Sequence, residues 1–223
     1  MNFKKTEANY TPLTPISFLE RTAKIFPNYI SIITENKKFT WKETYERSVL
    51  LASSLIKKNI KVGDVVSIMA PNSNAIYEAH FAIPMSGAVI NTINIRLEPK
   101  TISFIIRHSK TKLIFVDTEF LPVIRTALKI CKHQVTLIAI KDDKKFSKNL
   151  INEKTYESFV REGKKNTLTK FRIKDEWSPI SLSYTSGTTN KPKGVVTHHR
   201  GAYLNAISNQ LAWNMKKNPN YLW

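Results

Sequence analysis

The chain has 223 residues, and hydrophobic residues make up 42% of them, which is enough to bury a core and excludes disorder by composition. No apolar run approaches the roughly 18 residues that a membrane span needs, and the N-terminal segment lacks the apolar stretch of a signal peptide. Lysine and arginine number 35 against 17 acidic residues, a net charge of +18, but they are scattered along the chain. A specific nucleic-acid surface would gather them on one face, so we expect only non-specific attraction to polyanions. The single cysteine excludes an internal disulfide and indicates the cytoplasm.

Predicted helices and strands alternate along the chain, which is typical of α/β proteins. Pro15 suits the first position of a helix, and Thr40 with Glu43 has the spacing of a capping box, a helix-start signal. In chain order the first half predicts a helix over 15–26, a strand over 30–34, a helix over 40–58, a strand over 65–70, a helix from 72 or 73 to about 87 and an extended stretch over 89–95.

The second half continues this alternation. It predicts a helix over 101–108, strands over 113–117 and 135–140 around a helix over 121–131, a short helix over 156–161, strands at 179–184 and 195–196, and a helix from 200 to about 215. Helical crossovers join parallel strands. The expected fold class is therefore α/β, with mainly parallel sheets flanked by helices on both faces.

The segment SYTSGTTNKPKGVV, residues 183–196, forms the predicted loop between the last two strands. Gly187 and Gly194 would let the backbone approach an anion closely and adopt positive φ, and backbone N–H groups with hydroxyls could then surround phosphate. Lys193 would add a mobile positive charge. The spacing of the two glycines, with a valine after the second, disfavours the Walker A loop of kinases and GTPases. The segment is thus either a phosphate-binding loop or a solvated hairpin loop of turn-forming residues.

The longer segment YTSGTTNKPKGVVTHHR resembles the phosphate-binding signature of the AMP-forming acyl-activating enzymes, Ser-Gly-Thr-Thr-Gly-x-Pro-Lys-Gly. Asn190 stands at a glycine position of that signature, a mild departure because asparagine tolerates left-handed φ. The stretches FTWKETYERSVLLASSL, VGDVVSIMAPN and KLIFVD resemble further segments of the family in the same order, so the resemblance covers nearly the whole chain. The stretch NTINIRL favours the fatty or medium-chain acyl-CoA ligase branch.

The resemblance implies ATP-dependent activation of a carboxylic acid to acyl-adenylate and then acyl-CoA, with ATP, Mg²⁺ and coenzyme A as small-molecule partners. The cofactor-binding residues that it implies are Thr185, Ser186, Gly187, Thr188, Thr189, Asn190, Lys193 and Gly194. The Mg²⁺ that accompanies ATP is expected near Thr188.

Segments that the family carries further along are absent from this sequence. The resemblance therefore implies that residues 1–223 are the N-terminal portion of the AMP-binding domain, without the rest of that domain, the C-terminal domain or a catalytic residue, and that the chain is inactive alone. Two other functions stay open: a non-catalytic interaction fragment, and a basic protein that binds polyanions or nucleic acid. His198 and His199 would point to opposite faces of a strand, which does not favour a shared metal ion.

Overall fold

The computed structural model describes residues 4–6, 8–34, 37–141, 144–165, 173, 175–185 and 191–222. The elements in the first half of the chain are α1 (Ile16–Ile25), β1 (Ile30–Ile33), β2 (Lys38–Thr40), α2 (Trp41–Lys57), β3 (Val65–Met69), α3 (Asn74–Met85), β4 (Val89–Thr92) and α4 (Pro99–His108). Those in the second half are β5 (Leu113–Asp117), the 3₁₀ helix η1 (Thr118–Phe120), α5 (Leu121–Cys131), β6 (Thr136–Ile140), the 3₁₀ helix η2 (Lys144–Asn149), β7 (Lys154–Thr155), α6 (Tyr156–Arg161), β8 (Pro179–Thr185), β9 (Lys193–His198) and α7 (His199–Ala212).

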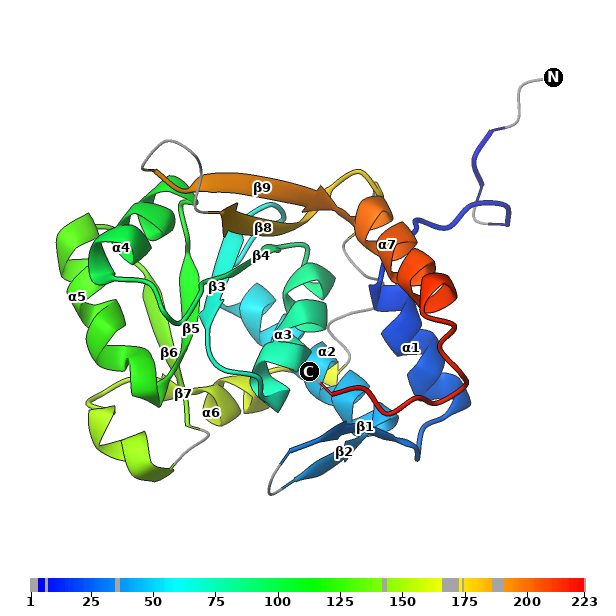
Figure 1. Ribbon diagram of the computed structural model, residues 1–223, viewed down its shortest axis with the longest axis horizontal. Helices are drawn as coiled ribbons and strands as arrows, with labels where there is room; N and C mark the ends of the chain where they lie inside the picture. Colours follow the sequence, from blue (N-terminus) through cyan, green and yellow to red (C-terminus); the bar gives the residue numbers. More distant parts are fainter. Residues whose placement is uncertain are drawn as a thin grey trace.

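The described strands form one large sheet and one small one. The large sheet has seven strands in the order β7-β6-β5-β3-β4-β8-β9, and the small sheet pairs β1 with β2. Neighbours from β7 to β8 run parallel, whereas β9 pairs antiparallel with β8 at the end of the sheet. The expected α/β class with a mainly parallel sheet is confirmed (Figure 1).

Helices cover both faces of the central strands, because successive strand residues point to opposite faces and both sets are apolar. On β5, Leu113 and Phe115 belong to one core while Ile114 and Val116 belong to the other, and all four are fully buried. The first core is completed by α1, α2, α3 and α6, and the second by α4 and α5, which lie on the other side of the sheet in Figure 1.

Local side-chain contacts mark the start of α2 and the turn of the chain after β4. The capping box is confirmed, since the Glu43 N–H donates to Thr40 Oγ1 at 3.2 Å and the Thr40 N–H donates to Glu43 Oε2 at 2.8 Å. β4 ends at Thr92 rather than at residue 95, and the Asn94 side chain accepts a hydrogen bond from the Arg96 N–H where the chain turns. The sequence analysis missed β2, which pairs with β1 just before α2.

The helices are of moderate length. α2, with 17 residues, is among the longest, and within the described residues none combines the length and apolar character needed to cross a bilayer.

Candidate functional site

The predicted loop starts at the carboxyl end of β8. This strand joins the parallel part of the sheet through β4 and pairs antiparallel with β9, so that Tyr184 faces Gly194 and Thr185 faces Lys193. The β-branched residues Val195 and Val196 favour the extended backbone of β9. The structure confirms that two strands hold the loop between them (Figure 1).

Three of the expected cofactor-binding residues are described, namely Thr185, Lys193 and Gly194. The remaining five, Ser186, Gly187, Thr188, Thr189 and Asn190, lie outside the described residues. Residues directly opposite each other in an antiparallel pair point to the same face of the sheet. Thr185 and Lys193 therefore place a hydroxyl and an ammonium group on one face at the end of the hairpin, and both residues are exposed.

The backbone of Gly194 does not adopt the positive φ that its sequence context predicts. Gly194 lies within the extended strand β9, and the glycines with positive φ in the described residues are Gly63 and Gly87. A Cβ added at position 194 would lie 3.0 Å from Leu182 Cδ1 and 3.5 Å from the Tyr184 ring. Glycine at this position thus makes room for neighbouring side chains of β8 and supplies no left-handed turn.

Tyr184 anchors the base of the hairpin to α4. Its hydroxyl lies 2.7 Å from His108 Nδ1, its ring meets the His108 ring edge-on at 5.8 Å, and Phe104 stacks on His108 at 5.3 Å. Burial raises the pKa of Tyr184, which keeps its hydroxyl neutral. Because Thr185 is the next residue, this contact fixes the point at which the loop begins.

The two histidines at the junction of β9 and α7 have structural partners. The Gly201 N–H donates to His198 Nδ1 at 2.9 Å, so His198 caps α7, while buried His199 places Nδ1 2.9 Å from Thr14 Oγ1. His199 is already the first residue of α7, so the expectation that both histidines lie on a strand is wrong. Burial, together with the neighbouring His198, lowers the pKa of His199 from 6.5 to about 4. No group of three or more potential metal-ligating His, Cys, Asp or Glu residues occurs in the part of the chain that the structure describes.

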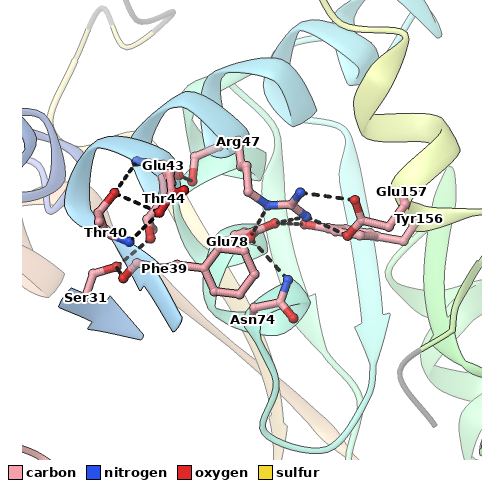
Figure 2. Close-up of polar contacts among 11 residues, drawn as sticks. Ser31, Phe39, Thr40, Glu43, Thr44, Arg47, Asn74, Glu78, Tyr156 and Glu157 are labelled. Carbon is pink, nitrogen blue, oxygen red and sulfur yellow. Dashed lines mark hydrogen bonds and ion pairs between the residues drawn. The ribbon is translucent and has the colours of Figure 1, made fainter. Parts of the chain in front are cut away.

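A polar cluster that the sequence analysis missed joins α2, α3 and α6 (Figure 2). Arg47 donates from Nε to Glu78 Oε1 at 2.7 Å and from Nη2 to Glu157 Oε1 at 2.7 Å. The Tyr156 hydroxyl donates to Glu78 Oε2 at 2.7 Å, and both Glu78 and Tyr156 are buried. Burial opposes the charge of Arg47, but the hydrogen bonds to Glu157 and Glu78 outweigh it and raise the pKa of Arg47. These mutual contacts make the cluster a cross-link between helices.

The hairpin loop begins at the edge of the sheet that is formed by the carboxyl ends of the parallel strands. From β3 the chain crosses through α3 to β4 on one side of β3, and from β4 it crosses through α4 to β5 on the other side. The connections after β3 and β4 therefore leave towards opposite faces, and ligands of open α/β sheets bind at such a switch point. β8 lies next to β4, so Thr185 ends a strand beside this point.

Several known proteins are similar to this chain in sequence or in fold. A family model described as AMP-binding enzyme matches residues 19–223. The peroxisomal butyrate–CoA ligase AAE11 of Arabidopsis thaliana is 46% identical over 230 residues, which cover 100% of this chain and 40% of the relative. The peroxisomal trans-cinnamate:CoA ligase of Petunia hybrida is 46% identical over 237 residues, which cover 98% and 41%. The crystal structure of the anthranilate CoA ligase AuaEII in complex with anthranoyl-AMP superposes with a TM-score of 0.77 at 20% identity, covering 88% of this chain and 37% of that one, and shows the shared fold.

The chain spans about two fifths of the length of the curated relatives it matches. The family model nevertheless matches most of this chain, from α1 through the hairpin to α7. The chain belongs to the AMP-binding enzyme family.

Proposed function

We propose that the hairpin loop binds the triphosphate of ATP, and that the chain is part of an AMP-forming acid–CoA ligase. The observation that carries the proposal is the placement of Thr185 and Lys193 on one exposed face, at the carboxyl edge of the parallel sheet and beside the switch point. Membership of the AMP-binding enzyme family supports it. We retain Ser186, Gly187, Thr188, Thr189 and Asn190 as the other residues of the loop that would face phosphate.

The proposed reaction has two steps. A carboxylate oxygen of the acid attacks the α-phosphorus of ATP, the bond to the bridging oxygen breaks, and pyrophosphate leaves as the acyl-adenylate forms. The sulfur of coenzyme A then attacks the acyl carbon, loses its proton, and AMP leaves with the electron pair of the broken C–O bond. Such transfers depend on positioning and on neutralising charge.

The residues of this chain would serve that positioning. Lys193 would neutralise phosphate charge, and the Thr185 hydroxyl would donate a hydrogen bond to a phosphate oxygen. Mg²⁺, when bound with ATP, neutralises further charge and prefers oxygen ligands such as hydroxyls. The Thr185 hydroxyl is an exposed group of that kind. The proposed position of the metal ion remains the neighbourhood of Thr188.

The substrate and the compartment are proposed only at a coarse level. The relatives are named for butyrate and trans-cinnamate, so a short aliphatic or an aromatic acid is as well supported as the fatty acid that NTINIRL favours. Both relatives are named as peroxisomal, which makes the peroxisome the rival of the proposed cytoplasmic location. Fluorescence microscopy of a tagged chain distinguishes the two. The share of the relatives that is covered supports residues 1–223 as the N-terminal portion of the AMP-binding domain.

Calorimetric titration of the 223-residue chain with Mg·ATP tests the loop. A hydrogen bond to a charged group contributes about 1.5–3 kcal/mol, so Lys193→Ala should weaken ATP binding at least about tenfold. Lys216→Ala, which removes an exposed lysine beyond α7, is the matched control and should change the affinity by less than about twofold. Equal affinities of the parent and Lys193→Ala would refute the role of Lys193.

Two further measurements separate the remaining functions. We expect no acid-dependent exchange between ATP and pyrophosphate from this chain alone, so detectable exchange would refute its expected inactivity. A general polyanion binder would show a steep dependence on salt and no preference for ATP over inorganic polyphosphate. An interaction fragment would bind another polypeptide whether or not nucleotide is present.

A further inference from the structure

A cavity of about 360 Å³ lies at the edge of the large sheet where its parallel strands begin. This volume falls within the roughly 300–1,000 Å³ that is typical of ligand sites. Because β3, β5 and β6 run parallel, their starts share one edge of the sheet, and the hairpin loop lies at the opposite edge. The polar residues of its lining come from the connection between α2 and β3, from the position before β5 and from the start of β6: Lys58, Asn59, Lys61, Asp64, Lys112 and Thr136.

Main-chain hydrogen bonds hold the walls of this cavity in place. The Lys112 N–H donates to the carbonyl of the first residue of β3 at 2.9 Å, and the Thr136 N–H donates to the Lys112 carbonyl at 3.1 Å. Across the turn before β3, the Lys61 N–H donates to Asp64 Oδ2 at 2.8 Å. The backbone groups are thus satisfied within the chain, and the side chains of the lining are left for other contacts.

The side chains that line the cavity are mostly unpartnered donors. Lys58, Lys61 and Lys112 are exposed, and none of the three forms a hydrogen bond or an ion pair through its side chain with another described group. The same holds for the Asn59 amide and the Thr136 hydroxyl among the residues that the structure describes. An ammonium group only donates hydrogen bonds, and an amide and a hydroxyl can also donate.

The charge of the lining has the sign that suits an anion. Three lysines stand against one aspartate, Asp64, whose Oδ2 already accepts the Lys61 N–H. Lysine binds phosphate as a compact positive charge, and hydrogen bonds between charged groups are stronger than those between neutral ones. Donors that converge on one cavity from three separate parts of the chain can therefore hold an anion with several oxygen atoms.

We propose that this cavity binds a small soluble anion that carries a phosphate group, either inorganic phosphate or a phosphate monoester. Lys58, Lys61 and Lys112 neutralise its charge, and the Asn59 amide and the Thr136 hydroxyl donate to its remaining oxygens. The volume leaves room for an organic part beside the phosphate. This site is separate from the hairpin loop, and the proposal does not depend on ATP binding there.

Nuclear magnetic resonance of the ¹⁵N-labelled 223-residue chain tests the site without nucleotide. The chain is titrated with glycerol 3-phosphate and, separately, with inorganic phosphate in 0.15 M sodium chloride, where the screening length is about 8 Å. We expect saturable shifts of the amides of residues 58–64, 112 and 136, with a dissociation constant on the order of 1 mM. Tighter binding of glycerol 3-phosphate would assign the organic part to the cavity, and equal binding would assign the site to inorganic phosphate. Shifts that do not saturate, or that are confined to residues 193–198, would overturn the proposal.

Three variants distinguish a site from general attraction to a basic protein. Lys112→Gln should weaken binding at least about tenfold, because it removes one charged hydrogen-bond donor. Lys42→Gln is the matched control, since it removes an exposed lysine at the other end of α2, and it should change the affinity by less than about twofold. Equal effects of these two variants would overturn the proposal.

The third variant, Asp64→Asn, should tighten binding. It removes the negative charge from the lining and keeps an oxygen that can accept the Lys61 N–H, so we expect a gain in affinity of at least about threefold. A damaged fold does not produce such a gain, which makes this variant decisive even if Lys112→Gln is unstable. Unchanged or weaker binding by Asp64→Asn would contradict an anion site in this cavity.

Discussion

The buried carboxylate of Glu78 should be the most sensitive polar group of the first core. It accepts hydrogen bonds from Arg47 Nε at 2.7 Å, Arg47 Nη2 at 3.2 Å, the Tyr156 hydroxyl at 2.7 Å and Asn74 Nδ2 at 3.3 Å, and its side chain has no solvent exposure (Figure 2). Glu78→Gln keeps the shape of the side chain but removes its charge and sets an amide N–H₂ group against donors. The guanidinium of Arg47, whose side chain is only 21% exposed, then loses one of its two carboxylates.

The expected cost follows from the geometry. Removing one partner of a buried ion pair costs about 3–5 kcal/mol. Arg47 keeps Glu157 and some exposure to solvent, so we expect the lower end, about 3 kcal/mol in the free energy of unfolding. Glu157→Gln is the matched control, since the side chain of Glu157 is 46% exposed, and it should cost less than about 1 kcal/mol. Tyr156→Phe removes one hydrogen bond and should cost about 1 kcal/mol.

Urea unfolding followed by far-ultraviolet circular dichroism measures these differences. With a slope of about 2–3 kcal/mol per molar urea, Glu78→Gln should lower the midpoint by about 1 M or more. If Glu78→Gln does not fold, the double variant Arg47→Met/Glu78→Leu decides, because replacing both members of a buried pair by apolar residues is nearly neutral. A cost for Glu78→Gln no greater than that of Glu157→Gln would refute the reasoning.

The remaining predictions concern packing, pH and the hairpin. A Cβ at Gly163 would overlap a backbone oxygen of α2, so Gly163→Ala should cost about 1–3 kcal/mol in urea unfolding, and a neutral result would contradict that close contact. Burial holds the pKa of His199 at about 4 against 6.5, so the unfolded chain takes up a proton that the folded chain resists, and stability falls as the pH drops from about 6.5 towards 4. His199→Gln should lose that part of the pH dependence between pH 7.5 and 5 in thermal unfolding; parallel curves for the parent and the variant would argue against it. If the bond between Tyr184 and His108 sets the start of the loop, Tyr184→Phe should weaken Mg·ATP binding several-fold with an unfolding midpoint near that of the parent, and adding His108→Phe should weaken binding no further. Additive losses in that cycle would show that the two side chains act separately.

Much of the fold could be predicted because its signals are local. Both cap signals lie within four residues of a helix start, and the strand Leu113–Asp117 and the helices Leu121–Cys131 and Tyr156–Arg161 have the bounds that their apolar patterns predict. Pro15 was expected inside the first helix but precedes it as the N-cap residue, and the hydroxyl of the neighbouring Thr14 lies 2.9 Å from His199 Nδ1. That contact joins residues 185 positions apart, and no local pattern contains it.

The functional residues divide in the same way. Thr185 and Lys193 could be predicted as site residues because they lie in one short segment with a recognisable order of residue types. A hairpin within that segment is enough to bring the two residues together. The Arg47 cluster draws on three helices that are far apart in sequence, and its single signal was a carboxylate, Glu78, in the mainly apolar α3.

The order of strands explains why the candidate loop lies at the carboxyl edge of the sheet. β8 is the last strand that runs parallel with the others, so its carboxyl end contributes to the edge where ligands of such sheets bind. β9 must turn back from that edge, and as the final described strand it leaves its own outer side unpaired. That return places Lys193 on β9 opposite Thr185 on β8, so one hairpin supplies both of these candidate site residues.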